Sequence, residues 1–193
     1  MKSMAGAPTH AEVEARTLRW LRDAVIGLNL CPFAKAVDAK GQLRIAVTDA
    51  TDEATLRAAL RDELRLLVAA DAQRIDTTLL VHPQALAGDF DAFNQFLDEA
   101  DDELRAQRLE GEIQIASFHP HYRFAGTDAD DITNATNRAP FPMLHLLREA
   151  SVERAVAAFP DADAIVDANL ATLRRLGHAG WARLAAGWAE GER

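Results

Sequence analysis

The chain has 193 residues, of which 49% are hydrophobic and 26% charged, and 30 acidic against 21 basic side chains give it a formal net charge of −9. These values are ordinary for a globular protein, so disordered and fibrous classes are excluded, and the length suffices for a single domain with a buried core. The acidic balance argues against nucleic-acid binding, which needs a basic face to neutralise phosphates.

Two further features of the composition predict where the protein works. No apolar run approaches the about 18 residues that span a bilayer, and residues 1–15 lack the apolar segment of a signal peptide. The single cysteine, Cys31, rules out an internal disulfide framework and is typical of a reducing compartment. We therefore expect a cytoplasmic protein without membrane contact. It should form one domain over residues 1–193, with a flexible tail over residues 1–10, and its oligomeric state stays open.

Helical and extended patterns alternate along the first two thirds of the chain. Apolar side chains at steps of three and four residues predict helices over residues 12–28, 52–67 and 89–107. Short apolar runs predict strands over residues 43–47, 75–81 and 113–118. From the first strand on, the order is βαβαβ. Because such crossovers are right-handed, we expect a three-stranded, mainly parallel α/β sheet covered by helices, with the first helix as an N-terminal addition.

The last third of the chain reads as helical. A polar stretch over residues 127–137 is expected to be a loop or one short helix, and Pro142 is well placed as the first residue of a helix over residues 142–150. Further helices are predicted over residues 152–159, 161–176, where Gly177 would end the helix, and 181–188. The C-terminal segment should therefore be entirely helical.

Histidines follow two of the predicted strands. His82 and His119 each stand before a proline at a strand end, and His121 lies two residues further on. Ligands of open parallel sheets bind beyond the carboxyl ends of the strands. These three imidazoles, with Asp49 after the first strand, are therefore candidates for a divalent metal or for acid–base catalysis. The alternative is that His82 and His119 are structural, with their rings bonded to backbone. No ligand spacing in the sequence identifies a metal or any cofactor.

A second group of candidates surrounds the predicted helix over residues 142–150. On such a helix His145, Arg148 and Glu149 would share one face, at spacings of three and four residues. Arg138 lies just upstream, and arginine forks suit a carboxylate or a phosphate. This pattern predicts an anion site with His145 as an acid–base residue, although a solvated charged face would read the same way.

The polar residues between these two groups, and the lone cysteine, complete the candidates. Possible substrate contacts are Tyr122, Arg123, Asp131 and Asn137. Helix capping explains part of this polar density. Cys31 stands before Pro32, where a helix N-terminus would favour a nucleophilic thiolate, but a free cysteine also packs often as a small buried hydrophobe.

Three long runs resemble a known family. They are LNLCPFAKAV (residues 28–37), ASFHPHYRFAG (residues 116–126) and DDITNATNRAPFPMLHLLREASVERAV (residues 130–156). Together they are similar to the bacterial family catalogued as domain of unknown function 1415, over nearly the whole chain from residue 12 to 187. The resemblance implies a small soluble bacterial protein and supplies no activity. Its characteristic runs coincide with the candidate residues.

The leading functional expectation is a small-molecule enzyme acting on an anionic substrate. Arg138 and Arg148 would hold a carboxylate or phosphate, His119 or His145 would move a proton, and Tyr122 and Asn137 would orient the substrate. One alternative is a metal-dependent hydrolase or oxidase with a histidine-rich site. Others are a non-catalytic protein that binds a metabolite or a partner through the same pocket, and a thiol enzyme that uses Cys31.

Overall fold

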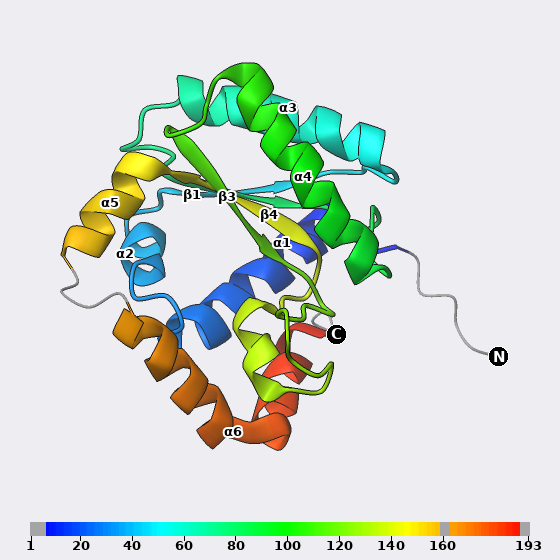
Figure 1. Cartoon of the computed structure of the whole chain (residues 1–193), viewed down its shortest axis with the longest axis vertical. Coiled ribbons are helices and arrows are strands. Elements are labelled where there is room, and N and C mark those ends of the chain that lie inside the picture. Colours follow the sequence, from blue (N-terminus) through cyan, green and yellow to red (C-terminus); the bar gives the residue numbers. More distant parts are fainter. Residues whose placement is uncertain (1–6, 159–162, 190–193) are drawn as a thin grey trace.

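A four-stranded mixed sheet forms the centre of the protein (Figure 1). The computed structural model describes residues 7–158 and 163–189. The strands are β1 (Leu43–Val47), β2 (Thr77–Val81), β3 (Ile113–Phe118) and β4 (Met143–Arg148), in the spatial order β1-β2-β4-β3. β1 and β2 pair in parallel, whereas β4 is antiparallel to both β2 and β3. The first three strands therefore run in one direction, and β4 runs against them from its place between β2 and β3.

Helices connect the strands and cover both faces of the sheet. They are α1 (His10–Trp20), the π-helical segment η1 (Leu21–Ile26), α2 (Ala34–Ala39), α3 (Glu53–Ala69), α4 (Phe90–Gln107), the 3-10 helix η2 (Ile132–Asn137), α5 (Glu149–Ala157) and α6 (Asp163–Ala189). No helix in the described ranges is both long and apolar enough to cross a membrane.

One face of the sheet packs against α3 and α4. The leucine stripe of α3 is fully buried, and it meets α4 and the inward side chains of the two central strands; the stripe comprises Leu56, Leu60, Leu64 and Leu67. Glu103 of α4 joins the two helices at their outer edge. Although it is only 2% exposed, its carboxylate accepts hydrogen bonds from Arg57 Nε (3.0 Å) and Arg61 Nε (2.9 Å) of α3. These hydrogen bonds, Arg61 first, outweigh burial and lower the pKa of Glu103 to about 2.

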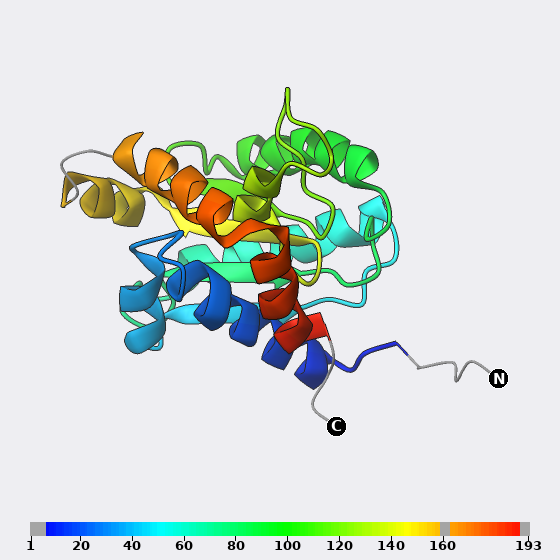
Figure 2. The ribbon, with the colours of Figure 1, turned by 90° about the horizontal axis from the view of Figure 1, so that it is seen from below.

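The other face packs against α1, η1 and the end of α6. Val13 and Trp20 of the N-terminal helix are buried with Met143 of β4 and Trp188 of α6. α1 and the C-terminal part of α6 lie side by side (Figures 1 and 2). Arg16 Nε closes this contact by donating to the Trp188 carbonyl oxygen at 2.6 Å.

The predicted helix over residues 142–150 is wrong, because Met143–Arg148 is strand β4. Both of its edges are hydrogen-bonded, so that His145 lies opposite Leu79 of β2 and Ala116 of β3. Both of its faces are covered, with Leu144 and Leu146 buried on the α3–α4 side and Met143 on the other. A strand buried on both faces carries no polar–apolar alternation, and a short apolar run then reads equally well as helix. The expected three-stranded, mainly parallel sheet is therefore a four-stranded mixed one.

The ends of the chain need smaller corrections. α1 begins at His10, where Thr9 and Glu12 form a capping box, two residues before the predicted start. Residues 1–6 of the expected tail and residues 159–162, where one predicted helix ends and the next begins, lie outside the described residues. Gly177 has a positive φ of 63° and interrupts α6 as predicted, and the helix that follows it through Ala189 includes the predicted helix over residues 181–188.

Candidate functional site

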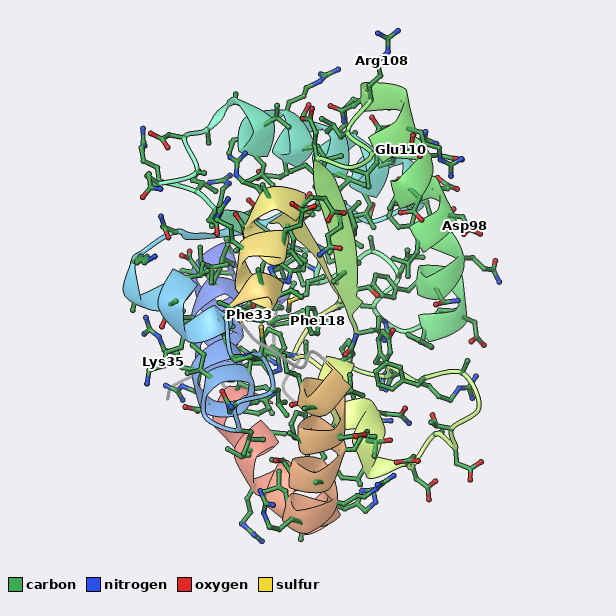
Figure 3. The ribbon with its side chains drawn as sticks, turned by 60° about the vertical axis from the view of Figure 1, so that its left-hand side comes forward. Phe33, Lys35, Asp98, Arg108, Glu110 and Phe118 are labelled. Atoms are coloured by element: carbon green, nitrogen blue, oxygen red, sulfur yellow. The ribbon has the colours of Figure 1, made fainter. Side chains whose placement is uncertain are left out.

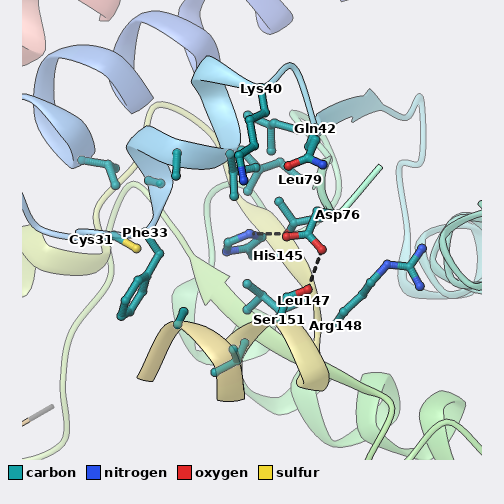
Figure 4. A pocket seen from close by; sticks show the side chains of 18 of the residues that line it. Cys31, Phe33, Lys40, Gln42, Asp76, Leu79, His145, Leu147, Arg148 and Ser151 are labelled. Carbon is teal, nitrogen blue, oxygen red and sulfur yellow. Dashed lines mark hydrogen bonds between the residues drawn. The ribbon is translucent and has the colours of Figure 1, made fainter. Parts of the chain in front are cut away.

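A pocket of about 510 Å³ lies between the sheet, η1, α2 and α5 (Figure 4). Its volume falls within the range of about 300–1,000 Å³ that is usual for small-molecule sites. Cys31 and Phe33 line it from the segment that leads into α2, Phe118 from the end of β3, and His145 from β4. The pocket thus joins Cys31 to the stretch around His145, a relation that the sequence alone left open.

His145 presents one ring nitrogen to this pocket. Its Nε2 lies 2.7 Å from Thr77 Oγ1, and Thr77 Oγ1 in turn lies 2.6 Å from the Leu146 carbonyl oxygen. A hydroxyl has one hydrogen, and the carbonyl can only accept, so Thr77 donates to Leu146 and accepts from His145 Nε2–H. Burial lowers the pKa of His145 to about 4, which keeps the ring neutral near pH 7. Nδ1 therefore carries a lone pair, and it has no hydrogen-bond partner among the described residues.

Charged and polar side chains gather at one side of the pocket, with Cys31 and Phe33 on the other side and His145 between them (Figure 4). Ser151 of α5 donates to Asp76 Oδ1 at 2.5 Å and accepts from Arg154 Nη2 at 2.9 Å. Lys40, at the end of α2, also lines this side. This end of the pocket therefore offers both cationic groups and a carboxylate to a ligand.

The polar group around Asp76, Thr77 and Ser151 was not predicted from the sequence. Residues at the amino ends of β1 and β2 line this part of the pocket, whereas the sequence directed attention to the carboxyl ends of the strands. One signal was present: Asp76, Thr77 and Thr78 form a polar start to an otherwise apolar strand. The approach of Ser151 depends on where α5 begins after β4, and no local pattern encodes that.

His82 lies in the core, on the α4 side of the sheet. Its ring is 0% exposed, and Nδ1–H donates to the Ala85 carbonyl oxygen at 2.9 Å. Nε2 is buried and has no hydrogen-bond partner within residues 7–158 and 163–189. Burial lowers the pKa of His82 to about 4, so the ring is neutral. Its nitrogens do not reach solvent, and its contacts fit the structural alternative.

His119 packs beside His82 and is also enclosed. Its ring stacks on Phe93 with centroids 5.1 Å apart, Nε2–H donates to the Leu86 carbonyl oxygen at 3.1 Å, and Nδ1 accepts from the His121 backbone N–H at 3.0 Å. Burial lowers the pKa of His119, and both nitrogens already have backbone partners. The ring has no free nitrogen for a substrate or a metal.

The predicted metal ligands come together only in part: the His119 ring lies beside His82 and 5.7 Å from the His121 ring, centroid to centroid, but Asp49 is apart from them. His121 is exposed at the surface, and Asp49 pairs with His10 at 2.7 Å on the far side of the strand ends. Within residues 7–158 and 163–189, no three side chains of His, Cys, Asp or Glu are grouped so that they could hold a metal ion.

The arginines predicted to bind an anion instead bind backbone carbonyl groups. Arg138 Nη2 donates to the Ala129 carbonyl oxygen at 2.6 Å, and burial lowers its pKa. Arg148 Nη2 donates to the carbonyl oxygens of Leu67 (2.6 Å) and Ala70 (2.8 Å) and so closes the C-terminus of α3. On a strand, neighbours three apart point to opposite faces. The prediction that His145, Arg148 and Glu149 share one face of a helix is therefore wrong. Arg148 still borders the pocket with the part of its side chain nearest the backbone.

The remaining candidates belong to the loop between β3 and β4, and none of them lines the pocket. Asp131 caps η2 by accepting from the Thr133 hydroxyl and backbone N–H, which lowers its pKa. Asn137 donates to the Ser117 carbonyl oxygen at 3.1 Å. The Tyr122 ring packs on Phe90 with centroids 5.1 Å apart, and Arg123 lies 3.7 Å from Asp91 in solvent.

The polar density of this loop is explained largely by Asn134, which the sequence did not single out as central. Asn134 is 0% exposed, and its Oδ1 accepts from the Phe124 backbone N–H (2.9 Å) and the Thr127 hydroxyl (2.8 Å). Its Nδ2 donates to the Asp128 carbonyl oxygen at 2.8 Å. One amide thus holds the loop together from inside, and the density reflects folding of the loop.

The comparisons with known proteins bear on the whole chain. No curated protein and no solved structure matches it. The match that is found covers residues 12–183 and therefore includes the pocket, β4 and most of α6. The chain belongs to the family described as protein of unknown function (DUF1415).

Proposed function

We propose that the pocket around His145 binds a small molecule and that His145 exchanges a proton with it, as the acid–base residue of an enzyme. The expectation of histidine chemistry on an anionic substrate is kept. Its location moves from the loop that follows β3 to the amino ends of β1 and β2.

A single observation supports this choice of residue. Three histidines have a pKa that burial lowers; within the described residues, His82 has an unpartnered nitrogen that solvent cannot reach, and His119 has a partner on each nitrogen. His145 combines an unpartnered Nδ1 with a place in the wall of a cavity. Thr77 holds the opposite nitrogen protonated, so Nδ1 is oriented as the acceptor.

The lowered pKa of His145 favours an anionic substrate. With a pKa of about 4 the free ring is a weak base at pH 7, and proton transfer is most efficient when the two values are close. A negative charge bound beside the ring stabilises its protonated form and raises its pKa. An anionic substrate would therefore activate its own base on binding.

Thermal-shift screening of carboxylated and phosphorylated metabolites, followed by product analysis of each hit, tests the proposal. Ala155→Trp fills the pocket from α5 and should abolish stabilisation by true ligands, whereas Ala157→Trp, on an exposed position of the same helix, should not. For a hit that is converted, His145→Gln should slow turnover by about 10²-fold or more, as loss of an acid–base residue does. Ligands that stabilise the Ala155→Trp variant as well as the parent, or turnover that survives His145→Gln, would refute the proposal.

Binding without catalysis is the second candidate. The walls of the pocket are mostly apolar, and a neutral imidazole of low pKa also suits a fixed hydrogen-bond acceptor. This candidate predicts hits that depend on His145 and on an open pocket, yet give no product after long incubation.

A further inference from the structure

We infer that the ligand is an amphiphilic anion, with its anionic oxygen group at Lys40 and Arg154 and an apolar body between Phe33 and Phe118. The inference rests on the proposed ligand site and adds the chemical class of the molecule that fills it.

The charge around the pocket points to an anion. Its lining includes two cationic side chains, Lys40 and Arg154, and one carboxylate, Asp76, whereas the guanidinium of Arg148 binds carbonyl oxygens of α3. The chain as a whole has a net charge of −9, so this local excess of positive charge runs against the average. A positively lined cleft attracts ligands of the opposite sign.

The cations have no carboxylate partners within the described part of the chain. Lys40 makes no ion pair there, and the side-chain contact of Arg154 is the neutral hydroxyl of Ser151. The Arg148 guanidinium binds carbonyl oxygens, which carry no formal charge. Asp76, the one negative group, already accepts the Ser151 hydroxyl. The positive charge at this end is therefore left for a ligand to balance.

The opposite end of the pocket is apolar and fits an apolar part of the ligand. Phe33 lies at this end beside Cys31 (Figure 4), and Cys31 packs in one apolar cluster with Trp20, Val25 and Phe118, which also line the pocket. Cys31 and Phe33 lie across His145 from Asp76 and Ser151 (Figure 4), so the rest of the molecule would lie at this end. A ligand that contacted only the cationic side chains would leave the apolar walls exposed to water. A ligand with an acyl or aryl body buries these walls and therefore binds more tightly than a small inorganic anion.

Three eight-carbon compounds that differ only in head group distinguish the contribution of the head-group charge to affinity from that of the alkyl chain. Octanoate, octan-1-ol and octylamine are titrated into the full chain by calorimetry at low salt. Lys40 and Arg154 are exposed, and two exposed charge contacts supply about threefold each. Octanoate should therefore bind about tenfold more tightly than octan-1-ol, and octylamine most weakly. The advantage of octanoate over octan-1-ol should shrink in 0.5 M salt, where exposed charges are screened. Hexanoate should bind about tenfold more weakly than octanoate, because it lacks two methylene groups.

Matched variants assign the head group to its cations. Lys40→Met and Arg154→Met should each weaken octanoate about threefold and leave octan-1-ol unchanged. Lys35→Met is the control, because Lys35 is an exposed lysine of the same helix that projects outward and does not line the pocket (Figure 3).

Each contrary outcome has a definite meaning. Equal binding of octanoate and octan-1-ol would overturn the anionic class and leave the pocket as a ligand site. Tighter binding of octylamine would overturn it as well, and would show that Asp76 sets the preference. Absence of binding by all three compounds would refute the inference about ligand class, whereas the proposed function fails separately, if metabolite hits persist in the Ala155→Trp variant.

Discussion

Acid should destabilise this protein through His82. The ring is 0% exposed, and burial lowers its pKa from 6.5 to about 4. Between these pH values the unfolded chain binds a proton that the folded chain does not, so the free energy of unfolding falls as the pH falls. The contribution of His82 is complete above about pH 6.5 and is lost progressively toward pH 4. The whole shift corresponds to about 3 kcal/mol.

His82→Asn isolates this contribution. The asparagine amide can still donate to the Ala85 carbonyl oxygen as His82 Nδ1 does, but it does not titrate. Loss of the ring contact with Phe93 should make the variant less stable than the parent at pH 7.5. At pH 4.5 that deficit should shrink or reverse, because the parent has lost about 2.5 kcal/mol that the variant retains.

Urea unfolding followed by tryptophan fluorescence, at a series of pH values from 7.5 to 4.5, measures both curves. His119 and His145 are the same in both proteins, so their effects cancel in the difference. A difference between parent and variant that stays constant over the whole range would refute the reasoning, because the ring would then titrate equally in the folded and unfolded chains.

Three further predictions concern stability, measured by urea unfolding at pH 7 and, for Glu103, also at a series of pH values down to 2. Glu103→Gln should lower the free energy of unfolding by about 2 kcal/mol, because the carboxylate that joins α3 to α4 is lost. The difference should fade between pH 4.5 and 2, as the parent carboxylate is protonated. The control Asp102→Asn, in an exposed pair with Arg105, should change stability by less than about 0.5 kcal/mol. Asn134→Ala should lower the free energy of unfolding by about 2–3 kcal/mol, because it leaves buried backbone groups without hydrogen-bond partners. It should also speed hydrogen exchange between β3 and η2, and unchanged exchange there would contradict the role of Asn134. Arg148→Met should cost about 1–3 kcal/mol by freeing the last carbonyl groups of α3, and a neutral result would show that solvent replaces the guanidinium.

Local patterns were sufficient for the long amphipathic helices and for the first three strands, whereas the short helix α2, which has no buried residue, was not predicted. The leucine stripe from Leu56 to Leu67 repeats at helical spacing because the other side of α3 faces water. The predicted strands over residues 43–47 and 113–118 agree with β1 and β3, and β2 begins two residues later than predicted. Turn residues bound these runs on both sides, so their limits were readable without any tertiary information.

β4 could not be recognised in the same way. Met143–Arg148 is rich in good helix formers and follows a proline, both of which favour a helix in isolation. It becomes a strand because β2 and β3 provide hydrogen-bonding edges on either side of it, and those edges exist only in the assembled sheet. Tertiary pairing here overrides local preference.

The same limit applies to the pocket. His145 and Cys31 were each singled out by residue type, and the structure places both in one cavity. Their polar neighbours come from the start of β2 and from α5, and they meet His145 through the pairing of β2 with β4 and the turn into α5. Sequence spacing contains neither relation. The histidines of the histidine–proline pairs after β2 and β3, which were candidates for a metal or catalytic site, instead pack in the core.

The position of β4 also bears on how the chain folds during synthesis. It is the last strand to be made, yet it lies between two strands made earlier. A nascent chain that ends at η2 holds β2 and β3 with no strand between them, and unpaired strand edges invite association with other chains. The sheet can close only after Arg148 has left the ribosome. This dependence on late, non-local pairing should make folding slow and leave the incomplete chain dependent on protection from aggregation.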